Sequence, residues 1–379
     1  MNKKVWIPVV VAVAIVGVVI GSRLHRGGSQ PETVRVGAVL ALTGEFANFG
    51  QEQRRALELA QERINSAGGV RGRRFEFVFE DSQGEASKGL SAVRKLIDVD
   101  NVPVTFVFQS TVINAVQPVT DKARVLLMAF AMDPQVAEAS DLTFRVYPNM
   151  RQQTEVMLDY LRGSEAKRVG ILFIQTPATQ YVVPKLLIPG INSQGREVVE
   201  QVSFTKNDRD LSTHVAKLKA SNPDTIVTLA HFIFIPAILK TLKEQAVLDR
   251  VRILGDLSYT FPLDVDRSLL EGVMFVAPRY ALEDRSEGER SSFEREFKKR
   301  YGRFPGYDPV FFYDAALLLA EAMNRGGTSP TDIAEHLRSV KGYKGVSGEI
   351  TIDENGDAVV AMEVGVFRSG RMERLRRTE

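Results

Sequence analysis

A short polar loop, Gln109 to Thr111, follows the apolar run at 102–108 (VPVTFVF) and precedes a stretch with helical spacing of apolar residues. The Ser110 hydroxyl could cap that helix. It could instead join the free N–H groups of the first helical turn in binding an anion such as a carboxylate. Both interpretations of Ser110 stay open, and Thr111 belongs to the same candidate site. This is chemistry of binding, not of bond cleavage.

No motif for covalent or metal chemistry accompanies this loop. The sequence lacks Gly-x-Ser-x-Gly, and its nearest approach, GVSG at 345–348, is one residue too short for a hydrolase nucleophile. The four histidines lack His-x-x-x-His spacing, and the acids of DENGD at 353–357 fit a hairpin turn better than a calcium loop. We therefore predict no enzymatic activity, no metal site and no cofactor.

The glycine-rich segment at 64–83 (INSAGGVRGRRFEFVFEDSQ) has the wrong polarity for a nucleotide loop. Phosphate and dinucleotide loops place their glycines after a strand and before a helix. Here Gly68 and Gly69 follow a helical stretch and precede an alternating strand in which Phe75, Phe77 and Phe79 share one face. The segment predicts a corner between helix and strand, with glycines at positive φ.

Composition narrows the class of protein further. The chain has 379 residues, 44% of them hydrophobic, which is enough for more than one domain. Its 49 basic and 47 acidic side chains leave a net charge of +2, so no global field attracts nucleic acid. The absence of cysteine excludes disulfides, zinc thiolates, thiol nucleophiles and lipid attachment at an N-terminal cysteine.

The N-terminal sequence is predicted to be an export signal. Lys3 and Lys4 precede an uncharged apolar run from Val5 to Gly21, whose length suits either a long cleaved signal peptide or a short membrane anchor. We leave these two alternatives open for residues 1–21 and predict a flexible linker at 22–33. The working part of the protein is therefore predicted to be periplasmic or otherwise extracytoplasmic.

From Val34 onward, short apolar runs alternate with stretches of helical periodicity, which is typical of an α/β fold with parallel sheets. The predicted strands lie at 34–40, 74–80, 102–108, 125–131, 168–174, 198–204, 224–230, 251–255 and 272–277. So many strands favour two doubly wound sheets over one. We predict lobe 1 at 34–147 plus 279–358 and lobe 2 at 148–278 plus 359–379. A three-strand hinge would cross near Tyr147, Pro278 and Val359.

Three segments resemble one known family. They are LTGEFANFGQ at 42–51, INSAGGVRGRRFEFVFED at 64–81 and the closing GEITIDENGDAVVAMEVGVF at 348–367. In order and spacing they are similar to the leucine/isoleucine/valine-binding proteins, which are type I periplasmic binding proteins of ABC importers. The resemblance implies a monomer that closes two lobes on a small amino-acid-like solute and presents it to permease subunits, without nucleic acid. A membrane-tethered sensor on the same fold is the alternative.

The resemblance also implies site residues, each with a structural alternative. It gives Ser110 the ligand carboxylate. It brings Phe49 near the ligand, although Phe49 could instead staple the following helix. It makes Tyr181 ligand-facing, where a surface tyrosine is the alternative. His231 would replace an aromatic ligand contact or be structural. Asp256 matches the acid that binds an ammonium group only with a one-residue gap, and could instead cap the next turn.

The loop AFAMDP at 129–134 departs from the family pattern. The resemblance implies a threonine contacting the ligand's carboxylate and ammonium after Ala131, where this chain has Met132 and Asp133. Methionine supplies no donor, and an aspartate would repel a carboxylate or take up a proton. The loop therefore favours a larger, more apolar ligand or one without an α-amino-acid head group, unless Met132 is only part of the core.

Overall fold

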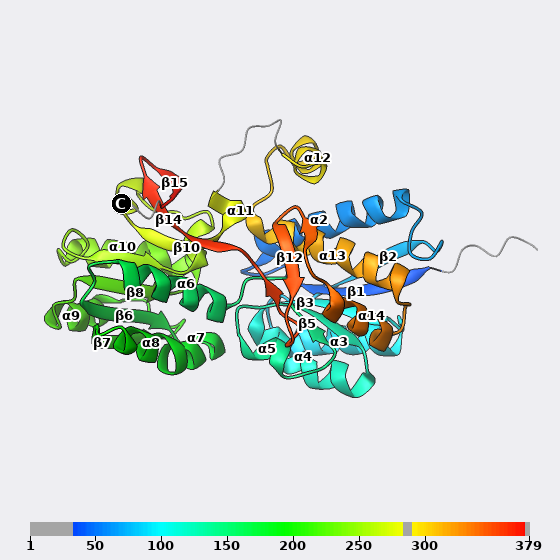
Figure 1. Ribbon diagram of the computed structural model, residues 1–379, viewed down its shortest axis with the longest axis horizontal. Helices are drawn as coiled ribbons and strands as arrows, with labels where there is room; N and C mark the ends of the chain where they lie inside the picture. Colours follow the sequence, from blue (N-terminus) through cyan, green and yellow to red (C-terminus); the bar gives the residue numbers. More distant parts are fainter. Residues whose placement is uncertain (1–32, 283–289, 376–379) are drawn as a thin grey trace, which may run out of the picture.

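The computed structural model describes residues 33–282 and 290–375, and Figure 1 shows two lobes side by side. The predicted apolar segment Val5–Gly21 lies outside these ranges, as does the linker up to residue 32. Within the described ranges, no helix combines the length and the apolar character needed to cross a bilayer.

Lobe 1 is built on a five-stranded parallel sheet with the order β2-β1-β3-β4-β5. Its strands are β1 (Val34–Leu40), β2 (Phe75–Asp81), β3 (Val104–Phe108), β4 (Leu126–Phe130) and β5 (Thr143–Phe144). Its helices are α2 (Ala47–Ser66), α3 (Ala86–Asp98), α4 (Ser110–Ala123), α5 (Gln135–Glu138), α12 (Ser292–Tyr301), α13 (Tyr307–Arg325) and α14 (Pro330–Ser339). A small antiparallel sheet of β11 (Tyr343–Gly345), β12 (Gly348–Ile352) and β13 (Ala358–Val359) completes it.

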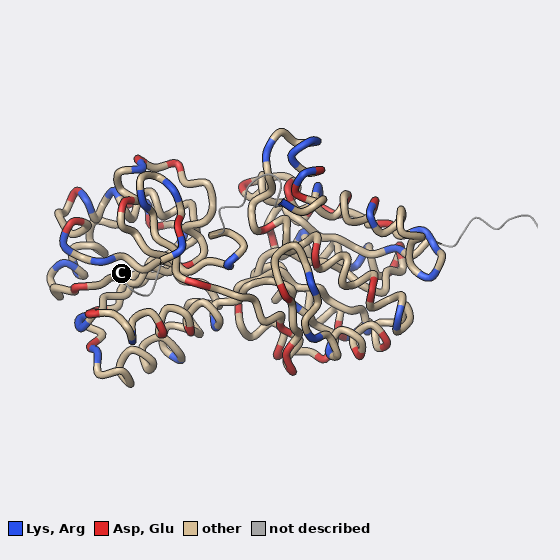
Figure 2. The backbone as a smooth tube through the Cα atoms, turned by 45° about the horizontal axis from the view of Figure 1, so that its top comes forward, with Lys and Arg blue, Asp and Glu red and all other residues tan. Residues whose placement is uncertain are grey.

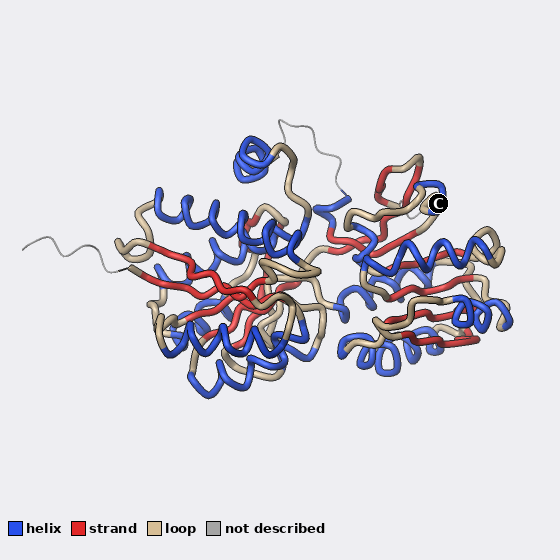
Figure 3. Tube along the Cα trace, turned by 180° about the vertical axis from the view of Figure 1, so that it is seen from behind, coloured by secondary structure: helices blue, strands red, loops and turns tan. Residues whose placement is uncertain are grey.

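Lobe 2 is built on a seven-stranded sheet with the order β15-β14-β10-β9-β8-β6-β7. In this sheet β14 pairs antiparallel with both of its neighbours, β10 and β15. Its strands are β6 (Arg168–Ile174), β7 (Glu197–Phe204), β8 (Thr225–Leu229), β9 (Arg252–Gly255), β10 (Met274–Pro278), β14 (Met362–Arg368) and β15 (Arg371–Arg374). Its longer helices are α6 (Met150–Gly163), α9 (Ser212–Ala220) and α10 (Ile235–Glu244). The short helices α7 (Pro177–Val182) and α8 (Ile188–Ser193) are joined by a π-helical segment (Val183–Leu187). Helices lie on both sides of each main sheet (Figure 3).

The prediction of two doubly wound α/β sheets is confirmed, and all the predicted strands are present with bounds shifted by at most two residues. The short strands β5, β11, β13 and β15 were not predicted. They are only two to four residues long, too short to show an alternating pattern.

The helix-to-strand corner at 64–83 is confirmed. Gly68, Gly69 and Gly72 have φ of 101°, 76° and 76°. At Gly69 a Cβ atom would lie 2.0 Å from the Arg73 carbonyl oxygen, so a side chain is excluded by space as well as by conformation. Phe75 and Phe77 are buried on one face of β2, with Phe79 in ring contact with Phe77.

The chain passes between the lobes at three places. One lies between β5 and α6, one follows β10, and one lies between β13 and β14. After β10 the short α11 (Arg279–Leu282) packs on β10 and β14, while Tyr280 reaches the core of lobe 1 and donates to Glu294 Oε1 at 2.8 Å. These positions support the predicted hinge, and the residue bounds of the lobes remain our proposal.

Candidate functional site

Aromatic side chains from the two lobes meet where their parallel strands end. From lobe 1, Phe46 lies 5.2 Å (centroid to centroid) from the ring of His231, and Phe49 lies 4.8 Å from Phe232 and 5.0 Å from Phe261. Phe46 is the N-cap of α2 and Phe49 lies in its first turn, so both follow β1 directly. His231 and Phe232 follow β8, and Phe261 follows β9. In a parallel α/β sheet this edge is where ligands bind.

Ser110 is not the cap of its helix, so that interpretation is wrong. Helix α4 begins at Ser110 itself, and its N-cap is Gln109, which has φ of 76° and makes no side-chain cap bond. The N–H groups of Val112 and Ile113 donate to the Gln109 carbonyl at 3.1 and 2.9 Å. Among the described residues the half-buried Ser110 hydroxyl and the exposed Thr111 hydroxyl have no hydrogen-bond partner. Anion binding by them stays a prediction.

The loop after β4, at 131–133, is held by burial, hydrogen bonds and core packing. Ala131 and Asp133 are each 3% exposed. Asp133 Oδ1 accepts the Gln135 N–H at 3.1 Å, and Oδ2 accepts from the Asn114 side chain at 3.4 Å. Met132 packs against the hydrophobic cores of both lobes, as its core interpretation required. Ligand contacts by these residues stay a prediction.

Tyr181 lies at the end of α7 beside a cation that sequence reasoning missed. The Arg151 guanidinium is 5.9 Å from the centre of the tyrosine ring, and its Nη2 is 3.5 Å from the hydroxyl. The same nitrogen pairs with Glu138 Oε1 at 2.5 Å. Because Glu138 belongs to lobe 1 and Arg151 to lobe 2, this ion pair joins the lobes beside a predicted ligand contact.

His231 lies between the rings of Phe46 and Phe232, at 5.2 and 4.4 Å. Burial lowers the pKa of His231 to about 4, because the charged imidazolium would lose its hydration. The ring is therefore neutral at physiological pH. Within the described ranges its buried Nδ1 has no hydrogen-bond partner. A neutral histidine with a free nitrogen can serve a ligand hydroxyl or other polar group.

Asp256 caps the following 3₁₀ turn (Leu257–Thr260), which confirms its structural alternative. Its Oδ1 accepts the Ser258 N–H at 2.9 Å, and the side chain is 1% exposed. Burial raises the pKa of Asp256 to about 7, since the hydrogen bond only partly offsets the lost hydration. Any contact with a ligand ammonium group is therefore additional to this cap.

Further residues at the lobe contact were not predicted. Tyr307, at the start of α13, lies 5.1 Å from Phe261. Its neighbour Asp308 accepts from Gln53 Nε2 at 2.8 Å and from the Tyr147 hydroxyl at 2.9 Å. Burial raises the pKa of Asp308 to about 6. The apolar run around Phe232 resembles helix core in the sequence, so only the fold reveals that it faces lobe 1.

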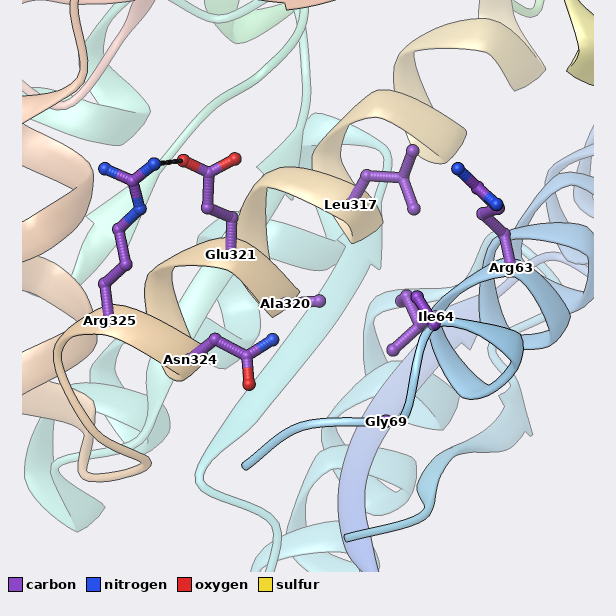
Figure 4. A pocket seen from close by; sticks show the side chains of 9 residues that line it. Arg63, Ile64, Gly69, Leu317, Ala320, Glu321, Asn324 and Arg325 are labelled. Carbon is purple, nitrogen blue, oxygen red and sulfur yellow. Dashed lines mark ion pairs between the residues drawn. The ribbon is translucent and has the colours of Figure 1, made fainter. Parts of the chain in front are cut away.

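A solvent-open hollow of about 270 Å³ lies at the opposite end of lobe 1, where α2 and α13 end (Figure 4). Ile64, Leu317 and Ala320 form its floor, and Glu321 pairs with Arg325 at 2.9 Å on its edge. It is remote from the strand ends that carry the predicted site. The described residues include no group of three or more metal-ligating side chains.

Two α/β lobes with three crossings, and with strand-end loops in contact across the gap between lobes, define a bilobal solute-binding protein. The family model described as periplasmic binding protein matches residues 33–371, and the chain belongs to that family. The family's shared activity is solute binding, not catalysis, and its location is extracytoplasmic.

Three similar proteins illustrate the match. Leu/Ile/Val-binding protein homolog 1 of Brucella suis is 24% identical over 352 residues, 90% of this chain and 92% of that protein. The substrate-binding protein LivJ of Streptococcus pneumoniae, solved with isoleucine, has a TM-score of 0.74 at 20% identity, covering 91% of this chain and 99% of that chain. A solute-binding protein of Rhodopseudomonas palustris, solved with 3,4-dihydroxybenzoic acid, has a TM-score of 0.75 at 20% identity, covering 90% and 96%.

Proposed function

We propose that the chain is the extracytoplasmic solute-binding protein of an ABC importer, and that it binds a small amino-acid-like, carboxylate or amide solute between its lobes. The observation that carries the proposal is the contact of Phe49 of lobe 1 with Phe232 and Phe261 of lobe 2 at 4.8 and 5.0 Å. Contacts between strand-end loops of separate lobes are those that a closing ligand would strengthen.

The candidate residues divide between the lobes. Lobe 1 contributes Phe49, Ser110, Thr111 and the loop from Ala131 to Asp133, and lobe 2 contributes Tyr181, His231 and Asp256. A ligand that touches both groups favours the closed form by its differential contacts. The permease would then recognise the closed protein, whose Glu138 and Arg151 are paired across the lobes. We propose that it acts as a monomer and without catalysis.

Thermal melting of the purified full chain against amino acids, aliphatic amides and aromatic acids tests this function. A solute at 100 times its dissociation constant should raise the free energy of unfolding by about 2.7 kcal/mol. Ser110→Ala should remove most of that gain, since it deletes a free hydroxyl at the predicted anion site. Lys122→Ala, on the exposed last turn of the same helix, should retain it. An unchanged ligand response in the Ser110 variant would contradict the assigned loop.

A tethered sensor is the alternative, because the apolar segment Val5–Gly21 without any cysteine also suits a retained membrane anchor. The two roles differ in their partner. Co-purification with permease and ATPase subunits supports import, whereas co-purification with a signalling enzyme supports sensing.

A further inference from the structure

The interlobe site exposes neither of the two acids among its candidate residues, so an α-ammonium group finds no open carboxylate in that set. Its two candidate carboxylates, Asp133 and Asp256, are 3% and 1% exposed. Both are already acceptors, Asp133 for Gln135 and Asn114, and Asp256 for Ser258. An ammonium group could donate to these carboxylates as an additional partner only by entering a buried environment, where it would lose its own hydration.

Aromatic rings make up the wall of the site instead. Phe49, Phe232 and Phe261 form a triangle with centroid separations of 4.8, 5.0 and 5.2 Å. Phe46 meets His231 edge-on at an interplanar angle of 85°. Flat rings that stack or meet edge to face gain about 0.5–1.5 kcal/mol per pair beyond the burial of their area. This wall therefore favours a planar aromatic ligand over a branched aliphatic one.

Two unpaired polar atoms lie beside the Phe46 ring. His231 Nδ1 is buried and has no hydrogen-bond partner within the described part of the chain, and the same holds for Gln109 Oε1. Gln109 Oε1 and Phe46 Cδ2 both lie within 3.0 Å of the Cβ position of Gly84, so they share one small region. A ligand hydroxyl can donate to either atom, because each carries a lone pair.

A site for the ligand's carboxylate is available at the start of α4. The Ser110 hydroxyl is free among the described residues, and it lies in the first turn of a 14-residue helix. The first helix amides paired with the Gln109 carbonyl are those of Val112 and Ile113. The N–H groups of Ser110 and Thr111 come before them in the helix. Amides at a helix N-terminus favour an anion.

From this combination we propose that the solute is an aromatic carboxylate that lacks an α-ammonium group and carries a ring hydroxyl. This inference rests on the proposed function and specifies the solute. The carboxylate binds at Ser110, the ring packs against Phe49, Phe232 and Phe261, and the hydroxyl pairs with His231.

Four matched ligands separate the contributions. Calorimetric titration of the full chain in mild detergent would compare 3-phenylpropanoate with L-phenylalanine, and 3-(4-hydroxyphenyl)propanoate with L-tyrosine. Members of each pair differ only in the ammonium group. Benzoate and 4-hydroxybenzoate extend the series to shorter acids, and L-leucine represents an aliphatic amino acid. We expect the acids without ammonium to bind at least tenfold more tightly than their amino-acid partners.

The hydroxyl contact is tested by His231→Phe, which keeps an aromatic ring but removes the free nitrogen. We expect the preference for hydroxylated over plain acids to fall to about one, while binding of 3-phenylpropanoate persists. Tighter binding of L-leucine or L-phenylalanine than of the acids overturns this inference and leaves the proposed function standing. If a cooperatively folded protein binds none of these compounds, the inference is also overturned, and the wider solute screen decides the function.

Discussion

Arg145 and Asp357 form a buried ion pair that joins two of the three crossings between the lobes. Arg145 Nε lies 2.8 Å from Asp357 Oδ1, and Nη2 lies 2.7 Å from Oδ2. The arginine is 0% exposed and also donates to the carbonyls of Ala131 and Asp133 in the loop after β4. The pair therefore connects the hinge to the loop that departs from the family pattern.

Replacing one partner of this pair should be costly. Arg145→Met leaves the Asp357 carboxylate buried without its cation, and we expect the free energy of unfolding to fall by about 3–5 kcal/mol. Chemical denaturation would measure this loss. The double variant R145M/D357L should recover part of it. Arg162→Met removes an exposed pair with Asp159 and should cost less than about 1 kcal/mol. A loss of less than about 1 kcal/mol in the Arg145 variant would contradict our interpretation of the pair.

Asp256 should make stability depend on pH. Burial raises its pKa to about 7 in the folded state, above the ordinary value near 4, so the folded form holds its proton more tightly. The stabilisation is complete below about pH 4 and is lost as the pH rises through about 7, at roughly 1.4 kcal/mol per unit. Asp256→Asn can still accept from Ser258 but cannot ionise. It should match the wild type at pH 4 and become progressively more stable than it toward pH 8.

The control for this experiment is Asp266→Asn. Asp266 caps an exposed 3₁₀ turn (Arg267–Leu269) by accepting the Ser268 N–H at 2.9 Å, so it has the same local role without burial. That hydrogen bond lowers its pKa, so its contribution is present above its unfolded pKa and is lost as the pH falls. The two variants should therefore differ from wild type in opposite directions across pH. Parallel pH profiles would refute the role of burial.

Gly50 allows the first turn of α2 to approach the end of β1. A Cβ atom there would lie 2.0 Å from the Ala41 carbonyl oxygen. Gly50→Ala must displace α2 together with Phe49, and we expect a loss of about 1–3 kcal/mol in unfolding free energy. Gly163→Ala, at the end of α6 with no atom within 4 Å of the new Cβ, should be neutral or stabilise by up to about 1 kcal/mol. Equal melting temperatures of the two variants would show that the contact relaxes without cost.

The pair between Glu138 and Arg151 should stabilise contact between the lobes, because it forms only when they approach. Its two side chains are 36% and 33% exposed, so salt screens it and we expect less than about 1 kcal/mol. Small-angle scattering at low salt should show a larger radius of gyration for Glu138→Gln than for wild type. Asp159→Asn, within a single helix, should leave the radius unchanged. Identical radii for Glu138→Gln and wild type would exclude an interlobe role.

Figure 2 shows acidic and basic residues interspersed along the backbone of both lobes, in keeping with a net charge of +2, which gives no global field to attract nucleic acid. Individual pairs within this pattern, such as Arg300 with Glu62, link segments distant in the sequence. Composition predicted the balance of charge but none of these partners, because pairing depends on which surfaces the fold brings together.

The sequence by itself determined the α/β class, the division into two sheets and the corner at Gly68 and Gly69. Each of these depends on apolar periodicity or on local backbone conformation, which a short segment carries on its own. Tertiary structure alone decided that Ser110 begins α4 without capping it, that Asp256 is used as a cap, and that Phe49 meets Phe232 and Phe261. Burial and contact between residues as far apart in the sequence as Phe49 and Phe261 arise only when both lobes pack, so no local pattern encodes them.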